Sequence, residues 1–527
     1  MKLKIFILTF SAFATIILTS CNKTQPQKVS DSPFYNVLDY GAVGDGQTNN
    51  TKAINTAIET AVKNGGGTVF FPAGDYLSFT IHLKSKITLH LDQGAVLIGD
   101  KEVNGVGYDL PEKETWYSKF QDFGHNYWKN SLIYGDSLRD IAITGEGMIW
   151  GKGLQTHDKP ELIGSGNKAI ALKNCVNVTI KDISILHGGH FCILATGVDN
   201  LTIDNVRVDA DRDGFDIDAC KNVRISNCII NSPTDDGLCL KSSFALGYAR
   251  DTENVTITNC QIFGYDEGSL LDGTCTTNFI DEAPGVNHCI TGRLKFGTES
   301  NGGFKNITVS NCVFEHSRGI AIETADGGSI EDILINNVTM RDITETPLFI
   351  RLNARMRGPD GIPVGTIKRV TISNFNVYDV GGRPKQPGLG AAMIMGIPGH
   401  YIEDLTLSNI RIYFRGGGTK DLINKEVPQN IDTYPDPYRW DSMPAYGFYF
   451  RYVKGLRVNN IVLRTLNKDE RPAFILDDVH DATFFNIDAQ QDENAPQFIL
   501  KNSSNISIHD VNGVQDLKTE KIRKKIL

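Results

Sequence analysis

The sequence lacks several features that would each point to a class of protein. No apolar run reaches the roughly 20 residues that cross a bilayer as a helix. Lys and Arg number 53 against 62 Asp and Glu, and the net charge of −9 excludes an overall basic field for binding nucleic acid. His and Cys pairs at zinc-ligand spacing are missing, so we expect no metal and no cofactor. Nine cysteines follow Cys21, and an odd number argues against a complete disulfide framework.

The N-terminus has the pattern of an export signal. Lys2 and Lys4 precede an apolar run over 5–18, which is too short for a transmembrane helix. The closing Leu-Thr-Ser-Cys resembles a bacterial lipoprotein signal, in which Cys21 carries the lipid. The alternative is an ordinary signal peptide with an incidental cysteine. We expect an exported lipoprotein, periplasmic or attached to the outer membrane, whose only membrane contact is the anchor on Cys21.

One short phrase recurs along the chain: Asn followed by alternating apolar and polar residues. Its first copies begin 23 and 22 residues apart, at Asn177, Asn200 and Asn222, and further copies begin at Asn254 and Asn306. Four cysteines also follow asparagine, which suggests that small thiols pack inside at one repeated station. Period-2 alternation within a repeat of just over twenty residues fits one coil of a parallel β-helix.

The fold prediction is therefore an all-β, right-handed parallel β-helix with one N-terminal capping helix. The helix is expected over 51–63, where apolar residues recur with helical spacing and Gly65-Gly66-Gly67 ends the pattern. Such a cap covers the open end of a solenoid. We expect a monomer with four segments: signal peptide 1–21, flexible tether 22–33, catalytic β-helix 34–515 and charged tail 516–527.

Three aspartates carry the strongest chemical signal. Asp213 precedes Asp235 by 22 residues, which is one coil, and Asp236 follows directly. Residues one coil apart stack at about 4.8 Å, so these carboxylates should crowd on one surface. Crowded like charges raise at least one pKa. A protonated carboxyl beside ionised ones is what glycoside hydrolysis requires, although single aspartates at such turns usually bind only the backbone.

Several blocks resemble known enzymes. The segments 35–46 and 65–76 look like the start of pectin-degrading β-helix enzymes. In glycoside hydrolase family 28, the polygalacturonase and rhamnogalacturonan hydrolase family, an Asn-Thr/Pro-Asp-Gly motif is followed one coil later by Asp-Asp. Here 211–214 reads Asp-Arg-Asp-Gly, with Asp in place of Asn, and Asp235-Asp236 follows. The resemblance extends from about Phe34 to about residue 415.

The resemblance implies an activity and roles. The chain would hydrolyse α-galacturonosyl linkages in an acidic plant polysaccharide or its oligosaccharides, by a single inverting displacement without a metal. Asp235 would be the general acid, and Asp213 and Asp236 would be the bases that hold the attacking water. Lys241 is a good partner for a substrate carboxylate.

Two family motifs are altered. The expected Gly-His-Gly falls in 263–268, which has no histidine, so Glu267 becomes a candidate substrate-binding residue in its place. The Arg-Ile-Lys motif falls either at Arg293 and Lys295, our other substrate-binding candidates, or within 318–324, which has lost both basic residues. Because both motifs grip uronate carboxylates, a galacturonate–rhamnose linkage competes with plain homogalacturonan.

Other residues are weaker candidates. Three arginines could line the same site or lie on the surface as solvated charges: Arg351, Arg355 and Arg357. Three aromatic residues could stack against sugar rings or pack in the core: Trp116, Tyr117 and Trp128. Inserted loops near 105–130 and 274–292 would wall off one end of a groove, which favours exo-action on short oligosaccharides.

Two other functions compete with hydrolysis. A β-helix polysaccharide lyase would use Ca²⁺ held by aspartates and form an unsaturated product, and its activity would vanish with a chelator. A non-catalytic glycan-binding solenoid would need no stacked aspartates, and Asp235→Asn would leave its binding unchanged.

Overall fold

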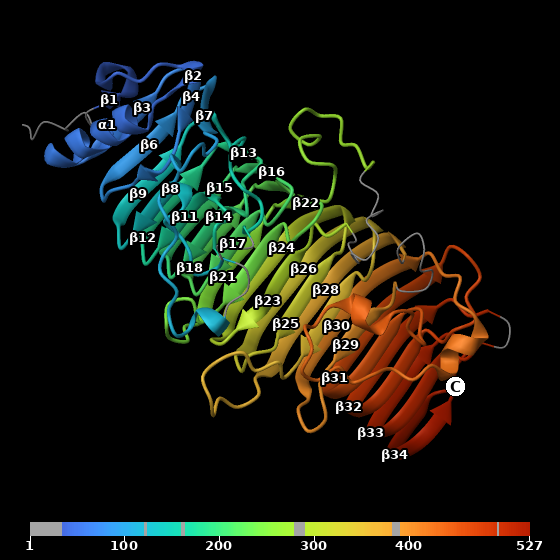
Figure 1. The fold of residues 1–527 in the computed structure, drawn as a ribbon. Coiled ribbons are helices and arrows are strands. Elements are labelled where there is room, and N and C mark those ends of the chain that lie inside the picture. Colours follow the sequence, from blue (N-terminus) through green and yellow to red (C-terminus); the bar gives the residue numbers. More distant parts are fainter. Residues whose placement is uncertain (1–33, 121–123, 160–163, 279–289, 382–389, 493–494) are drawn as a thin grey trace, which may run out of the picture.

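The computed structural model describes residues 34–120, 124–159, 164–278, 290–381, 390–492 and 495–527. The chain coils into a long parallel β-helix, as predicted, with α1 (Thr51–Lys63) at one end and β34 (Leu517–Ile526) at the other (Figure 1). No helix among these residues is long and apolar enough to cross a membrane. In the described part of the chain, four short 3-10 helices accompany α1: η1 (Val37–Tyr40), η2 (Ser118–Phe120), η3 (Lys420–Asn424) and η4 (Pro437–Trp440).

The coils contribute strands to three parallel faces, and the parallel ladders pair each strand with its counterpart one coil away. The first face begins with β1 (Phe34–Asn36), β3 (Gly67–Phe71), β6 (Ile87–Leu91), β9 (Arg139–Thr144), β12 (Val176–Lys181), β15 (Asp199–Asp204), β18 (Lys221–Ser226) and β21 (Thr252–Thr258). The second consists of β2 (Asp45–Asn49), β4 (Gly74–Ser78), β7 (Ala95–Gly99), β10 (Met148–Trp150), β13 (Ser184–Leu186), β16 (Arg207–Asp209), β19 (Ile229–Asn231) and β22 (Gln261–Phe263).

The third face carries the functional residues described below. Its strands are β5 (Ile81–His82), β8 (Ser131–Asp136), β11 (Lys168–Lys173), β14 (Phe191–Thr196), β17 (Phe215–Asp218), β20 (Leu238–Ser242), β23 (Leu294–Ser300), β25 (Ile320–Thr324), β27 (Leu348–Leu352) and β29 (Ala392–Met395). Later strands are long and bend across faces: β24 (Phe304–Ser317), β26 (Ser329–Ile343), β28 (Thr366–Val380), β30 (Ile402–Phe414), β31 (Phe448–Thr465), β32 (Phe474–Ala489) and β33 (Phe498–Val511).

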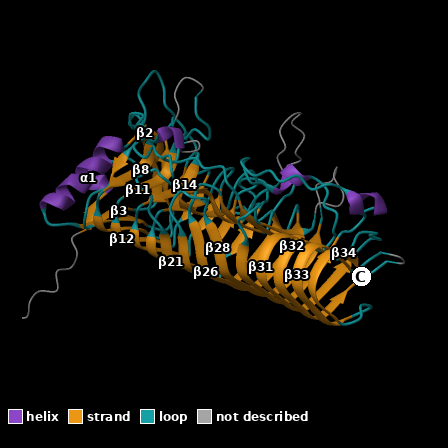
Figure 2. Cartoon of the chain, turned by 90° about the horizontal axis from the view of Figure 1, so that it is seen from below, coloured by secondary structure: helices purple, strands orange, loops and turns teal. Residues whose placement is uncertain are grey.

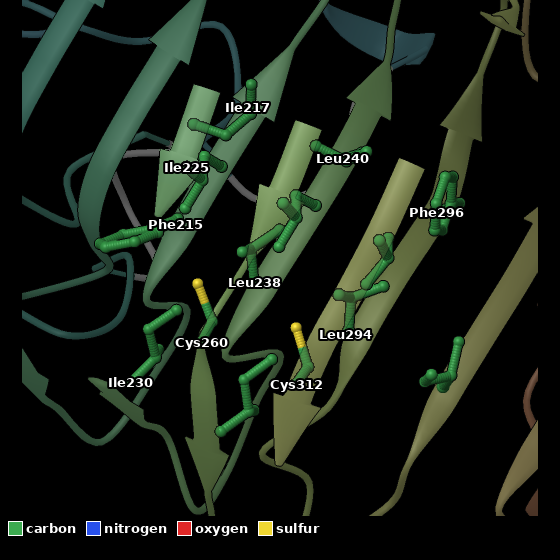
Figure 3. Close-up of a cluster of buried hydrophobic side chains, with 14 of the residues drawn as sticks. Phe215, Ile217, Ile225, Ile230, Leu238, Leu240, Cys260, Leu294, Phe296 and Cys312 are labelled. Atoms are coloured by element: carbon green, nitrogen blue, oxygen red, sulfur yellow. The ribbon is translucent and has the colours of Figure 1, made fainter. Parts of the chain in front are cut away.

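The core is a column of apolar side chains stacked in register. Phe215, Leu238 and Leu294 pair directly on successive coils, and Ile320 and Leu348 continue the row. All five are buried (Figure 3 labels the first three). Burial of this column is the main stabilising contribution, because each coil covers the apolar face of its neighbour. The prediction of inward-facing thiols is confirmed for Cys175, Cys228, Cys260 and Cys312, which are free and buried.

The recurring asparagines form two ladders of side-chain hydrogen bonds. In one, each amide from Asn200 to Asn306 donates to the asparagine one coil before it, at 2.8–3.1 Å. The other ladder runs through Asn227, Asn259, Asn311, Asn337, Asn374, Asn409, Asn460 and Asn486. All of these residues have positive φ, a conformation that asparagine tolerates better than most side chains. The repeated asparagines in the sequence thus mark the positions in each coil where the backbone adopts positive φ.

Replacing Asn337 by Ala is expected to lower the free energy of unfolding by about 1–3 kcal/mol, because alanine is strained at positive φ and the ladder bonds are lost. Asn337 accepts from Asn374 at 3.1 Å and donates to Asn311 at 3.2 Å, with a φ of 54°. Asn337→Gly removes the same bonds without the strain, so it should be less destabilising. Urea denaturation measures both. Equal losses in the two variants would contradict the strain argument.

The two ends of the solenoid are covered differently. The helix prediction is confirmed: α1 buries Ile54, Ala57, Ile58 and Ala61 against the first coils. The segment 516–527, expected to be a charged tail, instead contains β34, which pairs antiparallel with β33 and covers the last open edge. Its charges face outward while Ile522 is buried, so a charged sequence can still form an edge strand. The predicted signal and tether, 1–33, lie outside the described residues.

Candidate active site

The three aspartates lie on neighbouring coils, directly before strands of the third face. Asp213 precedes β17, and Asp235 and Asp236 precede β20; the amide of Gly214 donates to the carbonyl of Asp236 at 3.1 Å. A Cβ on Gly214 would stand 2.3 Å from the carbonyl oxygen of Gly237, so only glycine allows the turns to stack this closely. Loops gather along one side of the solenoid (Figure 2).

The predicted clustering of the aspartates is confirmed. One carboxylate oxygen from each lies within 4.8 Å of the others. Asp213 and Asp236 are buried, at 4% and 2% exposure, whereas the side chain of Asp235 is 33% exposed. Asp235 therefore presents the most accessible carboxylate of the three. Oxygens at this spacing could also hold a cation, so the protein's own positive groups need to be considered.

The surroundings separate two of the carboxylates electrostatically. Burial, together with the charges of Asp235 and Asp216, raises the pKa of Asp213 well above its usual value. Burial acts in the same direction on Asp236, but Arg293 at 2.5 Å and Lys295 at 3.2 Å outweigh it and lower its pKa. The site therefore combines a proton-holding carboxyl with a firmly ionised one, as acid–base catalysis requires.

Arg212 stands where the family motif has Thr or Pro, and it binds the third carboxylate. Its guanidinium donates to Asp235 at 2.8 Å and lies 3.8 Å from Asp213. Asp235 also accepts the backbone amide of Asp236 at 3.0 Å. Basic side chains of the protein thus neutralise Asp235 and Asp236, and they supply the positive charge that a bound cation would otherwise supply.

The aspartates open into a cavity of about 380 Å³, a volume within the usual range for small-molecule sites. Loops before and after the catalytic coils contribute to its walls. It is lined by His125, His157, Asp158, His190, Arg212, Asp213, Asp235, Asp236, Lys241, Lys295, Glu299 and Tyr434.

Of the four predicted substrate-binding residues, two line the cavity and two do not. Lys241 and Lys295 line the cavity. Lys241 also lies 3.2 Å from Glu299 and 2.5 Å from His125. Arg293 is buried beneath Asp236 and does not line the cavity.

Glu267 is also not a cavity residue, which corrects the predicted register. It accepts the backbone amide of Asp211 at 3.0 Å and lies 2.9 Å from His187. The chain leaves the coil after β22, and the third face resumes at β23, where Leu294 pairs with Leu238. The turn that follows Asp235-Asp236 by one coil is therefore Gly292-Arg293, so arginine, not Glu267, occupies the place expected for the family's histidine.

The weaker candidates also have definite places. Arg351 is buried and binds backbone carbonyls, Arg355 pairs with Asp326 at 2.5 Å, and Arg357 pairs with Glu299 at 3.1 Å. None of the three lines the cavity. Trp128 is core, whereas Trp116 is 64% exposed and packs edge-on against Phe244.

Sequence reasoning missed the residues that two loops bring to the site. His125, from the loop before β8, lies 2.9 Å from Asp216. Tyr434, from the loop between β30 and β31, accepts from Lys295 at 2.9 Å. Asp436 follows it, and its carboxylate pairs with Arg318 and lies 3.7 Å from Arg293. No repeat register places these residues, so nothing in the sequence locates them.

Comparisons with known proteins agree with this architecture. Family models match two segments: "Rhamnogalacturonase A/epimerase, pectate lyase-like" over 34–108 and "Right handed beta helix region" over 156–283. A probable polygalacturonase of Vitis vinifera is 28% identical over 322 residues, covering 58% of this chain and 60% of the relative. The chain thus spans less than two thirds of that relative's length.

Solved structures share the fold along nearly the whole chain. An exopolygalacturonase of Thermotoga maritima superposes with a TM-score of 0.58 at 18% identity, covering 94% of this chain and 95% of that one. A family 28 exopolygalacturonase of Yersinia enterocolitica gives a TM-score of 0.60 at 16% identity, covering 88% and 79%. The chain thus shares the parallel β-helix fold of these exopolygalacturonase structures and is similar in sequence to polygalacturonases.

Proposed function

We propose that this protein is a glycoside hydrolase that cleaves α-galacturonosyl linkages in pectin-type oligosaccharides. The observation that carries the proposal is the cluster of Asp213, Asp235 and Asp236 in the lining of a cavity that Lys241 and Lys295 also line. The carboxylates supply acid and base, and the two lysines supply partners for uronate carboxylates.

Asp235 is assigned as the acid, because it is the most exposed of the three and faces the cavity. The proton that it needs is held one coil away by Asp213, whose raised pKa favours the protonated form. Transfer of that proton to Asp235 leaves Asp213 ionised. It can then act with Asp236 as a base for the attacking water.

The spacing of the carboxylates raises the question of stereochemistry. In the general pattern, inverting enzymes separate acid and base by about 6.5–9.5 Å. Here one carboxylate oxygen of each aspartate lies within 4.8 Å of the others. We nevertheless propose inversion, because Asp236 is buried and held by Arg293 and Lys295, which disfavours direct attack on a sugar carbon. A carboxylate held in this way can still orient a water molecule.

We also propose exo-action. Loops on both sides of the catalytic coils contribute to the cavity, through His125 on one side and Tyr434 on the other. A site closed in this way suits the end of a short chain better than the middle of a long one. Rhamnogalacturonan-type linkages remain in the proposal because the place of the family's histidine is filled by Arg293.

The test is an assay of the mature protein with EDTA on polygalacturonate, rhamnogalacturonan I and short oligogalacturonides. Reducing ends and the ultraviolet absorbance of unsaturated uronate are followed together, and proton NMR reports the first anomer released. We expect new reducing ends without absorbance, an inverted anomer and mono- or disaccharides as first products. Unsaturated product, or activity abolished by EDTA, would favour a lyase. Retention would make Asp236 or Asp213 a nucleophile.

The location of the protein is a separate proposal. We propose that Cys21 carries a lipid that holds the enzyme on the cell envelope, on the basis of the signal-like segment that ends there. Cys21→Ser should release the protein from the membrane fraction without changing its activity.

A further inference from the structure

His190 is a cavity residue that the mechanism above does not use. It lies one coil before Arg212 and Asp213: Ile193 pairs with Phe215, and Cys192 donates its backbone amide to the carbonyl of Asp213 at 3.1 Å. The side chain belongs to the cavity wall, and the residue is only 2% exposed. Both ring nitrogens are buried, and neither makes a hydrogen bond of ordinary geometry with the described residues, although the backbone of Thr156 lies close enough to influence the pKa of the ring. Buried polar groups are nearly always paired, so a cavity-lining side chain whose ring nitrogens lack hydrogen bonds of ordinary geometry is a candidate to bind a ligand.

The surroundings fix both the charge and the position of this ring. Burial, and after it the positive charges of Arg212, Lys168 and His125, hold the pKa of His190 well below its usual value, so the imidazole is neutral. The ring packs edge-to-face against Phe191, with centroids 4.5 Å apart. A Cβ on Gly166 would stand 2.7 Å from Nδ1, so this glycine leaves room for the imidazole.

A neutral imidazole offers one donor and one acceptor. A carboxylate can only accept and an ammonium group can only donate, so each would leave one nitrogen unpaired. A sugar hydroxyl both donates and accepts, and neighbouring hydroxyls on one ring can satisfy both nitrogens. Among the parts of a uronic-acid chain, the ring hydroxyls therefore match His190 best, whereas the carboxylates match Lys241 and Lys295.

We infer that His190 is a specificity-determining residue that binds free ring hydroxyls of the sugar unit on the N-terminal side of Asp213. The inference rests on the proposed function and deepens it. A site with buried hydrogen-bonding groups discriminates strongly against a substrate that cannot pair them. The enzyme should therefore prefer sugar rings with free hydroxyls to rings on which those hydroxyls are acetylated.

The experiment compares an oligogalacturonide with its O-acetylated form on wild type, His190→Phe and His190→Asn. Wild type should show a kcat/KM at least about tenfold higher on the unmodified substrate. His190→Phe keeps the ring packing but has no polar atom, so its kcat/KM on the unmodified substrate should fall about tenfold or more, and the ratio between substrates should approach one. His190→Asn restores a donor and an acceptor and should recover part of the ratio.

The outcomes separate the two claims. If wild type cleaves neither substrate, the proposed function fails and this inference fails with it. If wild type is active and His190→Phe keeps the wild-type ratio, the inference alone is overturned. An equal loss on both substrates, with a lowered thermal midpoint, would make His190 a structural residue and would also overturn it.

Discussion

Asp235→Asn is expected to lower kcat on oligogalacturonides by about 10²–10⁴-fold, because it removes the group that protonates the leaving oxygen. The change should leave the thermal midpoint close to wild type. Asp235 is partly exposed, and the single amide oxygen of asparagine can still accept either from Arg212 or from the backbone of Asp236, which bind different oxygens of the carboxylate. Steady-state kinetics by reducing-end release, with a melting curve on the same preparation, measure both quantities.

The assignment of the acid can be tested with the leaving group. An aryl galacturonide whose phenol leaves without protonation should rescue the variant that lacks the acid, but not one that lacks the base. We expect rescue of Asp235→Asn and little rescue of Asp213→Asn. The reverse result would assign the acid to Asp213, on which the free enzyme holds its proton. Asp211→Asn, a neighbouring carboxylate outside the cavity, should stay within a few-fold of wild type.

Repetition in the sequence predicted most of the fold. The phrase that begins at Asn177 recurs because each coil needs a residue that accepts positive φ and bonds to its counterpart. The spacing of about one coil also predicted that Asp213 lies beside Asp235-Asp236; because Phe215 pairs with Leu238, the residue in register with Asp213 is Asp236. Where the coil length stays constant, the separation of two residues in the sequence predicts whether they are neighbours in space.

Insertions set the limit of that reasoning. Between β22 and β23 the chain leaves the solenoid, so counting coils placed Glu267 at a station that Gly292-Arg293 occupies. Tyr434 and Asp436 are more than a hundred residues from the cations that they contact. Their positions depend on a loop packing back across several coils, and no local periodicity encodes that packing.

The same buried network makes Arg293 the position where we expect the largest loss of stability. Its guanidinium pairs with Asp236 at 2.5 Å and lies 3.7 Å from Asp436, and all three side chains are nearly inaccessible. Arg293→Met would leave buried carboxylates with fewer counter-charges. We expect the free energy of unfolding at neutral pH to fall by about 3–5 kcal/mol, the range for breaking a buried ion pair. Urea denaturation followed by circular dichroism measures this loss.

The dependence on pH distinguishes lost charge pairing from lost packing. Positive neighbours lower the pKa values of Asp236 and Asp436 against the opposing effect of burial, so their stabilisation is present above the unfolded value of about 4 and is lost as the pH falls towards the folded values. In Arg293→Met these pKa values rise, and protonation relieves the buried charge. The gap between variant and wild type should therefore narrow from pH 7 to pH 4. Arg293→Lys should lose less, and Arg369→Met, at an exposed pair with Asp332, should change little. A gap that is the same at both pH values would mean that Arg293 stabilises the protein through packing alone.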